Sequence, residues 1–114
     1  MKTLTREEAM KFIINGRTFD TATASKVAVS RGINQPAYNN MVGDSEVRFE
    51  DVLYRTAKGA FFVHSHATEK LVKGGRPIVT DEATELFPSE VVKWITDNGA
   101  AVMDAAGLAL PDEA

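Results

Sequence analysis

The sequence contains no cysteine among its 114 residues. This excludes a disulfide framework and a thiolate zinc site, because both require cysteine sulfur. Long apolar runs are also missing, and none approaches the roughly 18 residues that a membrane-spanning helix requires. The first ten residues, MKTLTREEAM, are too charged for the apolar region of a secretory signal. We therefore expect a cytoplasmic protein with no membrane partner.

Positive charge is scarce overall, since the net charge is −3, and this argues against strong general affinity for nucleic acid. The charges are unevenly distributed along the chain. Residues 55–76 have a net charge of +4, whereas residues 77–114 have a net charge of −7. Apolar residues make up 44% of the sequence, which is enough for one core, and the length suits a single domain covering residues 1–114.

The dipeptide Asn15-Gly16 stands between two short runs of strand-forming residues, 12–14 and 17–19. A type I′ turn requires positive φ at both central residues, and Asn and Gly tolerate this best. The pattern therefore predicts a β-hairpin. The alternative is a first helix that continues through Ile14 and ends at Gly16.

A second hairpin is predicted from residues 47–56 and 60–67, joined by a turn at 57–59 in which Gly59 supplies a positive φ. These two segments hold the densest apolar cluster of the chain, which we expect to form the core of the sheet. A fifth, short strand is predicted at 78–79. Residues 33–46 are predicted to form a long loop, and residues 70–76 a basic loop.

Helices are predicted over residues 6–10, 22–31 and 90–98, with a helical turn at 80–82 that Pro88 interrupts, and residues 100–110 are predicted to be helical or frayed. In the second of these, Ala24, Val27, Ala28 and Arg31 recur at helical spacing. Ser89 is predicted to cap the helix over 90–98, whose Trp94 is expected to face the sheet near Tyr54, Phe61 or Phe62. Together these elements predict an α+β domain, with an antiparallel sheet of two hairpins (four to five strands) and helices packed on one face.

Two segments carry a family resemblance: Ile13–Ala24, with the sequence IINGRTFDTATA, and Leu53–His64, with the sequence LYRTAKGAFFVH. The pair resembles small accessory proteins of bacterial phages and other mobile genetic elements, in which a hairpin ends in an Asp-Thr-x-Thr-Ala turn into a helix. The chain departs from these proteins after His64, where Ser65-His66-Ala67-Thr68 replaces a glycine-rich loop. The resemblance implies a bacterial host cell and no catalytic motif. Small proteins of such elements often inhibit host defence, and anti-CRISPR proteins are among them.

His64 and His66 are the two histidines of the chain, and residues two apart on a strand point to the same face. With Glu50 or Asp51 of the partner strand they could form a two-histidine, one-carboxylate metal site. Two surface or half-buried histidines explain the same pattern, and we expect no metal and no other cofactor. The sequence shows no nucleophile elbow and no phosphate-binding glycine loop, so we expect no enzyme.

Three sets of residues are candidates for binding. Tyr38, in the polar loop over 33–46, is predicted either to pack against the sheet or to serve as an interface anchor. The acidic residues Asp81, Glu82 and Glu85 are candidates for contact with a basic protein surface. The basic residues are candidates for contact with nucleic acid or a partner, provided that the turn at 57–59 and the loop at 69–76 lie on the same side: Arg55, Lys58, Lys70, Lys73 and Arg76.

The sequence therefore leads to one hypothesis and one alternative. The first is a non-enzymatic mobile-element protein, monomeric or homodimeric, that binds and inhibits a host defence protein, with a CRISPR effector as the leading candidate. The alternative is an accessory or regulatory protein that contacts nucleic acid through residues 55–76.

Overall fold

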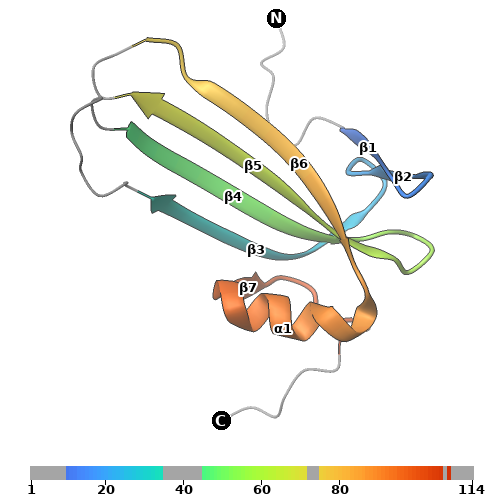
Figure 1. Ribbon diagram of the computed structural model, residues 1–114. Coiled ribbons are helices and arrows are strands. Elements are labelled where there is room, and N and C mark those ends of the chain that lie inside the picture. The colour runs from blue at the N-terminus through green and yellow to red at the C-terminus, as the bar shows by residue number, and fades with distance from the viewer. Residues whose placement is uncertain (1–9, 35–44, 72–74, 107, 109–114) are drawn as a thin grey trace, which may run out of the picture.

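The computed structural model describes residues 10–34, 45–71, 75–106 and 108. These residues form two antiparallel sheets and one helix (Figure 1). The small sheet pairs β1 (Lys11–Ile14) with β2 (Arg17–Asp20). The large sheet has the strand order β6-β5-β4-β3-β7. Its strands are β3 (Ser25–Asn34), β4 (Ser45–Arg55), β5 (Phe61–Leu71), β6 (Ile78–Leu86) and the short β7 (Ala101–Val102), and the helix is α1 (Pro88–Asn98).

The predicted α+β class is wrong, because the described chain is mostly β-structure with α1 as its one helix. The layer of helices expected on one face of the sheet is therefore not formed. Strands occupy two of the segments predicted to be helical, 22–31 and 80–82. A third, 100–110, begins with β7 and is not helical in its described part.

The first hairpin is confirmed. Asn15 and Gly16 adopt φ values of 52° and 76°, as a type I′ turn requires, and Phe12 pairs with Phe19 across it. The alternative of a continuous helix through Ile14 is thereby excluded. After the hairpin, an Asp20 carboxylate oxygen accepts a hydrogen bond from the Ala22 amide at 2.8 Å, which holds a turn. This turn leads into β3, whereas the resemblance implied a helix.

A β-bulge explains why β3 was mistaken for a helix. The pairing of β3 with β4 shifts between Lys26 and Ala28, so that Val27 is an extra residue on its strand. Val27 and Ala28 are both fully buried, although adjacent residues of a regular strand point to opposite faces. The bulge therefore brings the adjacent residues Val27 and Ala28 to the same core, as a helix face would, whereas Ala24 packs on the hairpin face and Arg31 is exposed.

The second hairpin is confirmed and is longer than predicted. β4 and β5 pair without interruption from Arg55↔Phe61 to Ser45↔Leu71. Their turn is closed by two backbone hydrogen bonds, from Gly59 N to Thr56 O at 2.9 Å and from Thr56 N to Ala60 O at 2.8 Å. Gly59 has a φ of 92°, so a residue with a side chain would be strained there.

The helix α1 begins at Pro88, one residue before the predicted cap at Ser89. Proline suits the first helical position, because its missing N–H has no partner there in any helix. A Glu90 carboxylate oxygen accepts a hydrogen bond from the Phe87 amide at 2.7 Å, which caps the helix start. Gly99 ends the helix in the left-handed conformation, as predicted.

The large sheet packs on both faces. On the helix face, Leu53 and Phe61 pack against Val91 and Ile95 of α1, and the half-buried Trp94 contacts this cluster. On the opposite face, named here the hairpin face, Phe19 packs against Phe62, with 5.2 Å between ring centroids. The expected contact of Trp94 with the sheet is thus confirmed on the side of Phe61. Tyr54 and Phe62 belong to the cluster on the hairpin face.

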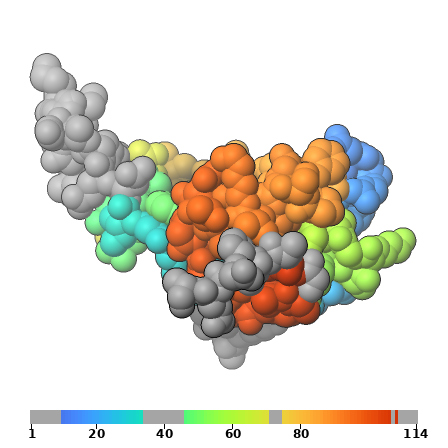
Figure 2. Space-filling view, turned by 90° about the horizontal axis from the view of Figure 1, so that it is seen from below, coloured from blue at the N-terminus to red at the C-terminus, as the bar shows by residue number. Residues whose placement is uncertain are grey.

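In the described part of the chain, neither packed layer extends over the whole length of the sheet. In the view from below, α1 lies over the middle of the molecule, and the ends of β3 and β4 (cyan and green) extend beyond it (Figure 2). The predicted helix over 6–10 falls almost entirely outside the described residues, as do Tyr38 and most of the loop predicted over 33–46. In the described part of the chain, no helix is both long enough and apolar enough to cross a membrane.

Candidate functional site

The hairpin face carries a row of four charged or titratable side chains across the sheet, one from each long strand. The strand register aligns them as neighbours, and we name them the charged row: Arg31 (β3), Glu50 (β4), His66 (β5) and Asp81 (β6). Arg31 donates a hydrogen bond to a Glu50 carboxylate oxygen, and the two form an ion pair. His66 and Asp81 form the second pair of the row. Opposite charges on directly facing strand positions stabilise the sheet.

Asp81 also contacts His64, the other histidine of β5. His64 Nε2 and His66 Nδ1 each lie 2.8 Å from the same oxygen, Asp81 Oδ1, and we name this group the histidine–aspartate cluster. The His64 side chain is 3% exposed, and the Phe12 ring of β1 lies against it, with 5.1 Å between ring centroids. The cluster therefore lies where the first hairpin meets the sheet.

The cluster changes the acidity of Asp81. Partial burial alone would raise the pKa of this carboxyl. The hydrogen bonds with His66 and His64, and the electrostatic interaction with both rings, outweigh this effect and lower the pKa of Asp81 below its ordinary value. Asp81 is therefore an ionised acceptor that holds two histidines in place.

A second row lies next to the charged row, on the side away from the turn between β4 and β5. We name it the outer row: Ile33, Arg48, Thr68 and Val79. Ile33 and Val79, at the two ends of this row, are each 56% exposed although they are large and apolar. Arg48 lies between them and donates a hydrogen bond to Glu46 at 3.0 Å, while its side chain remains 67% exposed. The row thus combines exposed apolar groups with an exposed cation.

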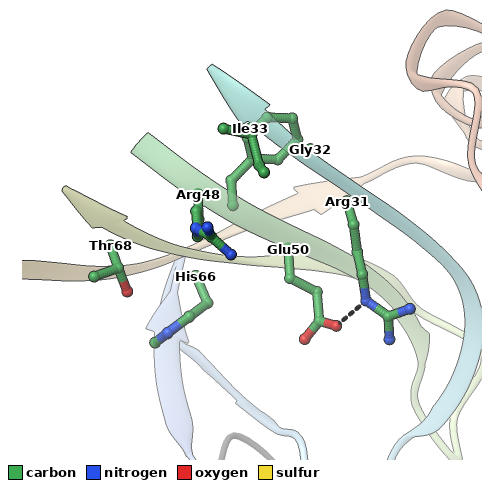
Figure 3. Close-up of a pocket in the computed structure, with 8 residues that line it drawn as sticks. Arg31, Gly32, Ile33, Arg48, Glu50, His66 and Thr68 are labelled. Carbon is green, nitrogen blue, oxygen red and sulfur yellow. Dashed lines mark hydrogen bonds and ion pairs between the residues drawn. The ribbon is translucent and has the colours of Figure 1, made fainter. Parts of the chain in front are cut away.

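Three residues of each row, with Gly32 and Phe49, line a depression that we name the open groove: Arg31, Gly32, Ile33, Arg48, Phe49, Glu50, His66 and Thr68. The two β6 residues of the rows, Val79 and Asp81, lie outside this lining. In Figure 3, Arg48 lies above Glu50 and His66, and Glu50 turns toward Arg31. Phe49 packs over Gly32, where an added Cβ would lie only 2.6 Å from its Cζ atom. Glycine at 32 therefore allows this aromatic ring to cover the backbone of the neighbouring strand.

The sequence identified the two histidines and missed their true partner. Asp81 falls in a segment predicted as a helical turn, whereas it lies opposite His66 on β6. Of the two proposed partners, Glu50 faces His66 in the charged row, whereas Asp51 is paired with Ser65 and lies on the other face. No group of three or more histidine and carboxylate side chains in residues 10–34, 45–71, 75–106 and 108 could hold a metal ion.

The structure does not bring the basic candidates together. Lys58 lies in the turn between β4 and β5, which projects from one end of the molecule, while Lys70 and Arg76 lie at the other end (Figure 1). β5 spans 11 residues between these ends, or roughly 35 Å at about 3.3 Å per residue. The condition that both segments lie on the same side is therefore not met. Lys73 lies outside the described residues.

Arg55 is engaged within the fold. It donates hydrogen bonds to the Asp104 carboxylate at 2.9 Å and to the Ala106 carbonyl oxygen. The Ala106 amide, which donates to the same carboxylate, and then Arg55 lower the pKa of Asp104. The Arg55 guanidinium therefore anchors the segment after β7 to the sheet, which is a structural role.

The acidic candidates all lie on β6 and face different surroundings. Asp81 belongs to the histidine–aspartate cluster, and Glu85 forms an ion pair with Arg17 of β2. Glu82 is exposed, and it has no ion pair or hydrogen bond within the part of the chain that the structure describes. Of the three, Glu82 is thus the carboxylate most accessible to a partner.

Comparison of the chain with family models, with curated proteins and with solved structures finds no match.

Proposed function

We propose that this protein is a non-enzymatic binding protein that recognises another protein through the open groove. The observation that carries the proposal is the outer row, three of whose residues line the groove. In this row Ile33 and, beside the groove, Val79 expose apolar surface on either side of an exposed arginine. Arginine is among the side chains that contribute most at protein interfaces, and apolar groups make up much of their buried core.

The charge of the groove favours a protein over nucleic acid as the partner. Arg31 and Arg48 are each paired with a carboxylate, Glu50 and Glu46 respectively. The two arginines are therefore balanced by two acids at the same surface, and a phosphate backbone would meet little net attraction. A protein surface can match this alternation of charge by pairing its own acids and bases with it.

The nature of the partner comes from the resemblance to small proteins of phages and mobile elements. On this basis the partner is a host defence protein, with a CRISPR effector as the leading candidate, and binding inhibits it. The protein then acts by occupying a surface that the effector needs, and no chemical step is required of it.

The test compares two single substitutions, Arg48→Ala and Lys93→Ala. Each removes an exposed lysine or arginine that forms one surface ion pair, but Lys93 lies on α1, away from the groove. The tagged proteins are used to capture binding proteins from a host lysate and are then assayed for inhibition of plasmid interference. Arg48→Ala should weaken capture and inhibition by about tenfold or more, as expected for an interface arginine, and Lys93→Ala should leave both unchanged.

Three outcomes would contradict the proposal. Capture of no defence component, with interference unchanged across CRISPR types, would remove the inhibitor function. Equal effects of Arg48→Ala and Lys93→Ala would remove the groove as the binding surface. A mobility shift of nucleic acid that weakens with salt, and that disappears when Lys58 and Lys70 are substituted, would support the accessory function instead.

A further inference from the structure

The outer side of β6 is an open sheet edge. Its inner side pairs with β5 in one continuous register from Phe61↔Leu86 to Glu69↔Ile78. In residues 10–34, 45–71, 75–106 and 108, no strand pairs with its outer side. In an antiparallel sheet, every second residue of an edge strand points both its N–H and its C=O away from the sheet. The edge therefore presents a row of backbone donors and acceptors with the spacing that another strand requires.

The two edges of the large sheet differ in protection. Natural proteins protect edges with bulges, prolines, charged side chains or a covering segment, because an open edge recruits other strands. On the opposite edge, β3 carries the bulge near Val27 and is covered by β7 at Ala28 and Val29. β6 has nine residues with no bulge, no proline and no lysine. The edge is thus regular over nine residues, and the first hairpin approaches it through the ion pair of Arg17 with Glu85. The part from Ile78 to Glu82, where the side chains are mostly exposed, is suited to binding a strand.

Side chains at the start of β6 provide the apolar part of such a contact. Ile78 and Val79 are 59% and 56% exposed, and they point to opposite faces of the sheet. Thr80 and Glu82 follow on the same face as Ile78, and both are exposed. An added strand would place its own side chains beside this row and would bury both apolar groups.

Charge decides which strand fits. β6 carries Asp81, Glu82 and Glu85 and has no basic residue. Two copies paired about Glu82 would bring the two Glu82 carboxylates face to face, which is unfavourable, and would join two acidic strands. We infer that the β6 edge, centred on residues 78–82, binds an extended segment of a partner protein that carries lysine or arginine at alternate positions. This inference rests on the proposed function only in taking the partner to be a protein.

The probe for this edge is a synthetic ten-residue peptide of alternating lysine and valine. Its backbone can extend the sheet, and one face of it is basic. Two control peptides are an alternating glutamate and valine peptide and the lysine peptide with every second amide N-methylated. Binding is measured by calorimetry, and its location by amide hydrogen exchange of the full-length protein. The lysine peptide should slow exchange at alternate residues of 78–82, and both control peptides should not.

Two matched variants test the position. Thr80→Lys places a positive charge on the edge, whereas Thr96→Lys makes the same change on the exposed surface of α1. Replacing a favourable cross-strand neighbour with a repelling one should weaken binding of the lysine peptide roughly 2- to 30-fold for Thr80→Lys. Thr96→Lys should bind as the unchanged protein does.

Each contrary result overturns the inference. It is wrong if the lysine and glutamate peptides bind equally, if protection falls outside β6, or if no protection develops at millimolar peptide. Protection of β6 in the protein alone, together with dimers in sedimentation equilibrium, would assign the edge to a second copy. If the peptide pairs with β6 but the protein does not inhibit interference, the proposed function is wrong and the edge assignment stands. If the protein inhibits interference but no peptide pairs with β6, the edge assignment is wrong and the proposed function stands.

Discussion

Replacing Asp81 by asparagine tests how the first hairpin is held on the sheet. The substitution keeps the shape of the side chain and removes the charge that accepts hydrogen bonds from His64 and His66, both at 2.8 Å. Hydrogen bonds to a charged group contribute about 1.5–3 kcal/mol, roughly twice the value for neutral groups. His64 is 3% exposed, so water cannot replace the lost interaction. We therefore expect Asp81→Asn to lower the free energy of unfolding by about 1–3 kcal/mol at pH 7.

The same substitution should remove a pH dependence. The pKa of Asp81 is lower in the folded protein than its ordinary value of about 3.9. A carboxyl of this kind stabilises the fold above its unfolded-state pKa, and this stabilisation is lost as the pH falls through the folded-state value. The unchanged protein should therefore lose stability below about pH 4, and its advantage over Asp81→Asn should shrink toward zero there.

Urea unfolding at a series of pH values measures both effects, with Glu82→Gln as the control. Glu82 is the next residue, is exposed, and loses the same charge on substitution, so its cost should stay within about 0.5 kcal/mol. Amide exchange over β1 and β2 reports the hairpin itself, because Phe12 packs on His64. If Asp81→Asn costs no more than Glu82→Gln, or if its cost is the same at pH 7 and pH 3, the reasoning about the cluster is refuted.

Three further substitutions test the packing. Phe62→Ala should cost about 3–5 kcal/mol in chemical unfolding, because this ring is fully buried between Phe19 and Tyr54; a cost below about 1 kcal/mol would contradict that packing. Gly32→Ala should cost about 1–3 kcal/mol, because its Cβ would meet the Phe49 ring at 2.6 Å, and an unchanged unfolding midpoint would show that the ring moves freely. Trp94→Ala should cost about 1–2 kcal/mol, less than for a fully buried tryptophan, and the native emission should be blue-shifted from that of a water-exposed indole.

Local turn chemistry was readable from the sequence because it depends on a few adjacent residues. Asn15-Gly16 and Gly59 adopt the positive φ values that their hairpins predicted, and Gly99 ends α1. In each case one residue tolerates a conformation that others avoid, and no distant contact is needed to decide it.

Two strands were mistaken for helices because their identity depends on their neighbours. In β3, the bulge places the adjacent residues Val27 and Ala28 in the same core, so the strand lacks the regular alternation that would have identified it. In β6, the segment 80–82 has a sequence that also suits a helix start. Its pairing with β5 made it a strand, and this pairing is a contact between distant residues.

In the candidate site, too, local geometry could be predicted from the sequence, whereas contacts between distant residues could not. The sequence by itself determined that His64 and His66 share a face, because strand geometry fixes the direction of residues two apart. It also placed the acidic residues in the last third of the chain. Only the tertiary structure decided that Asp81 binds the histidines and that the basic residues lie at opposite ends of the sheet. The same strand register left β6 with an open edge. The physical reason is that strand pairing joins residues far apart in sequence, so the composition of a segment cannot reveal which residues will face it.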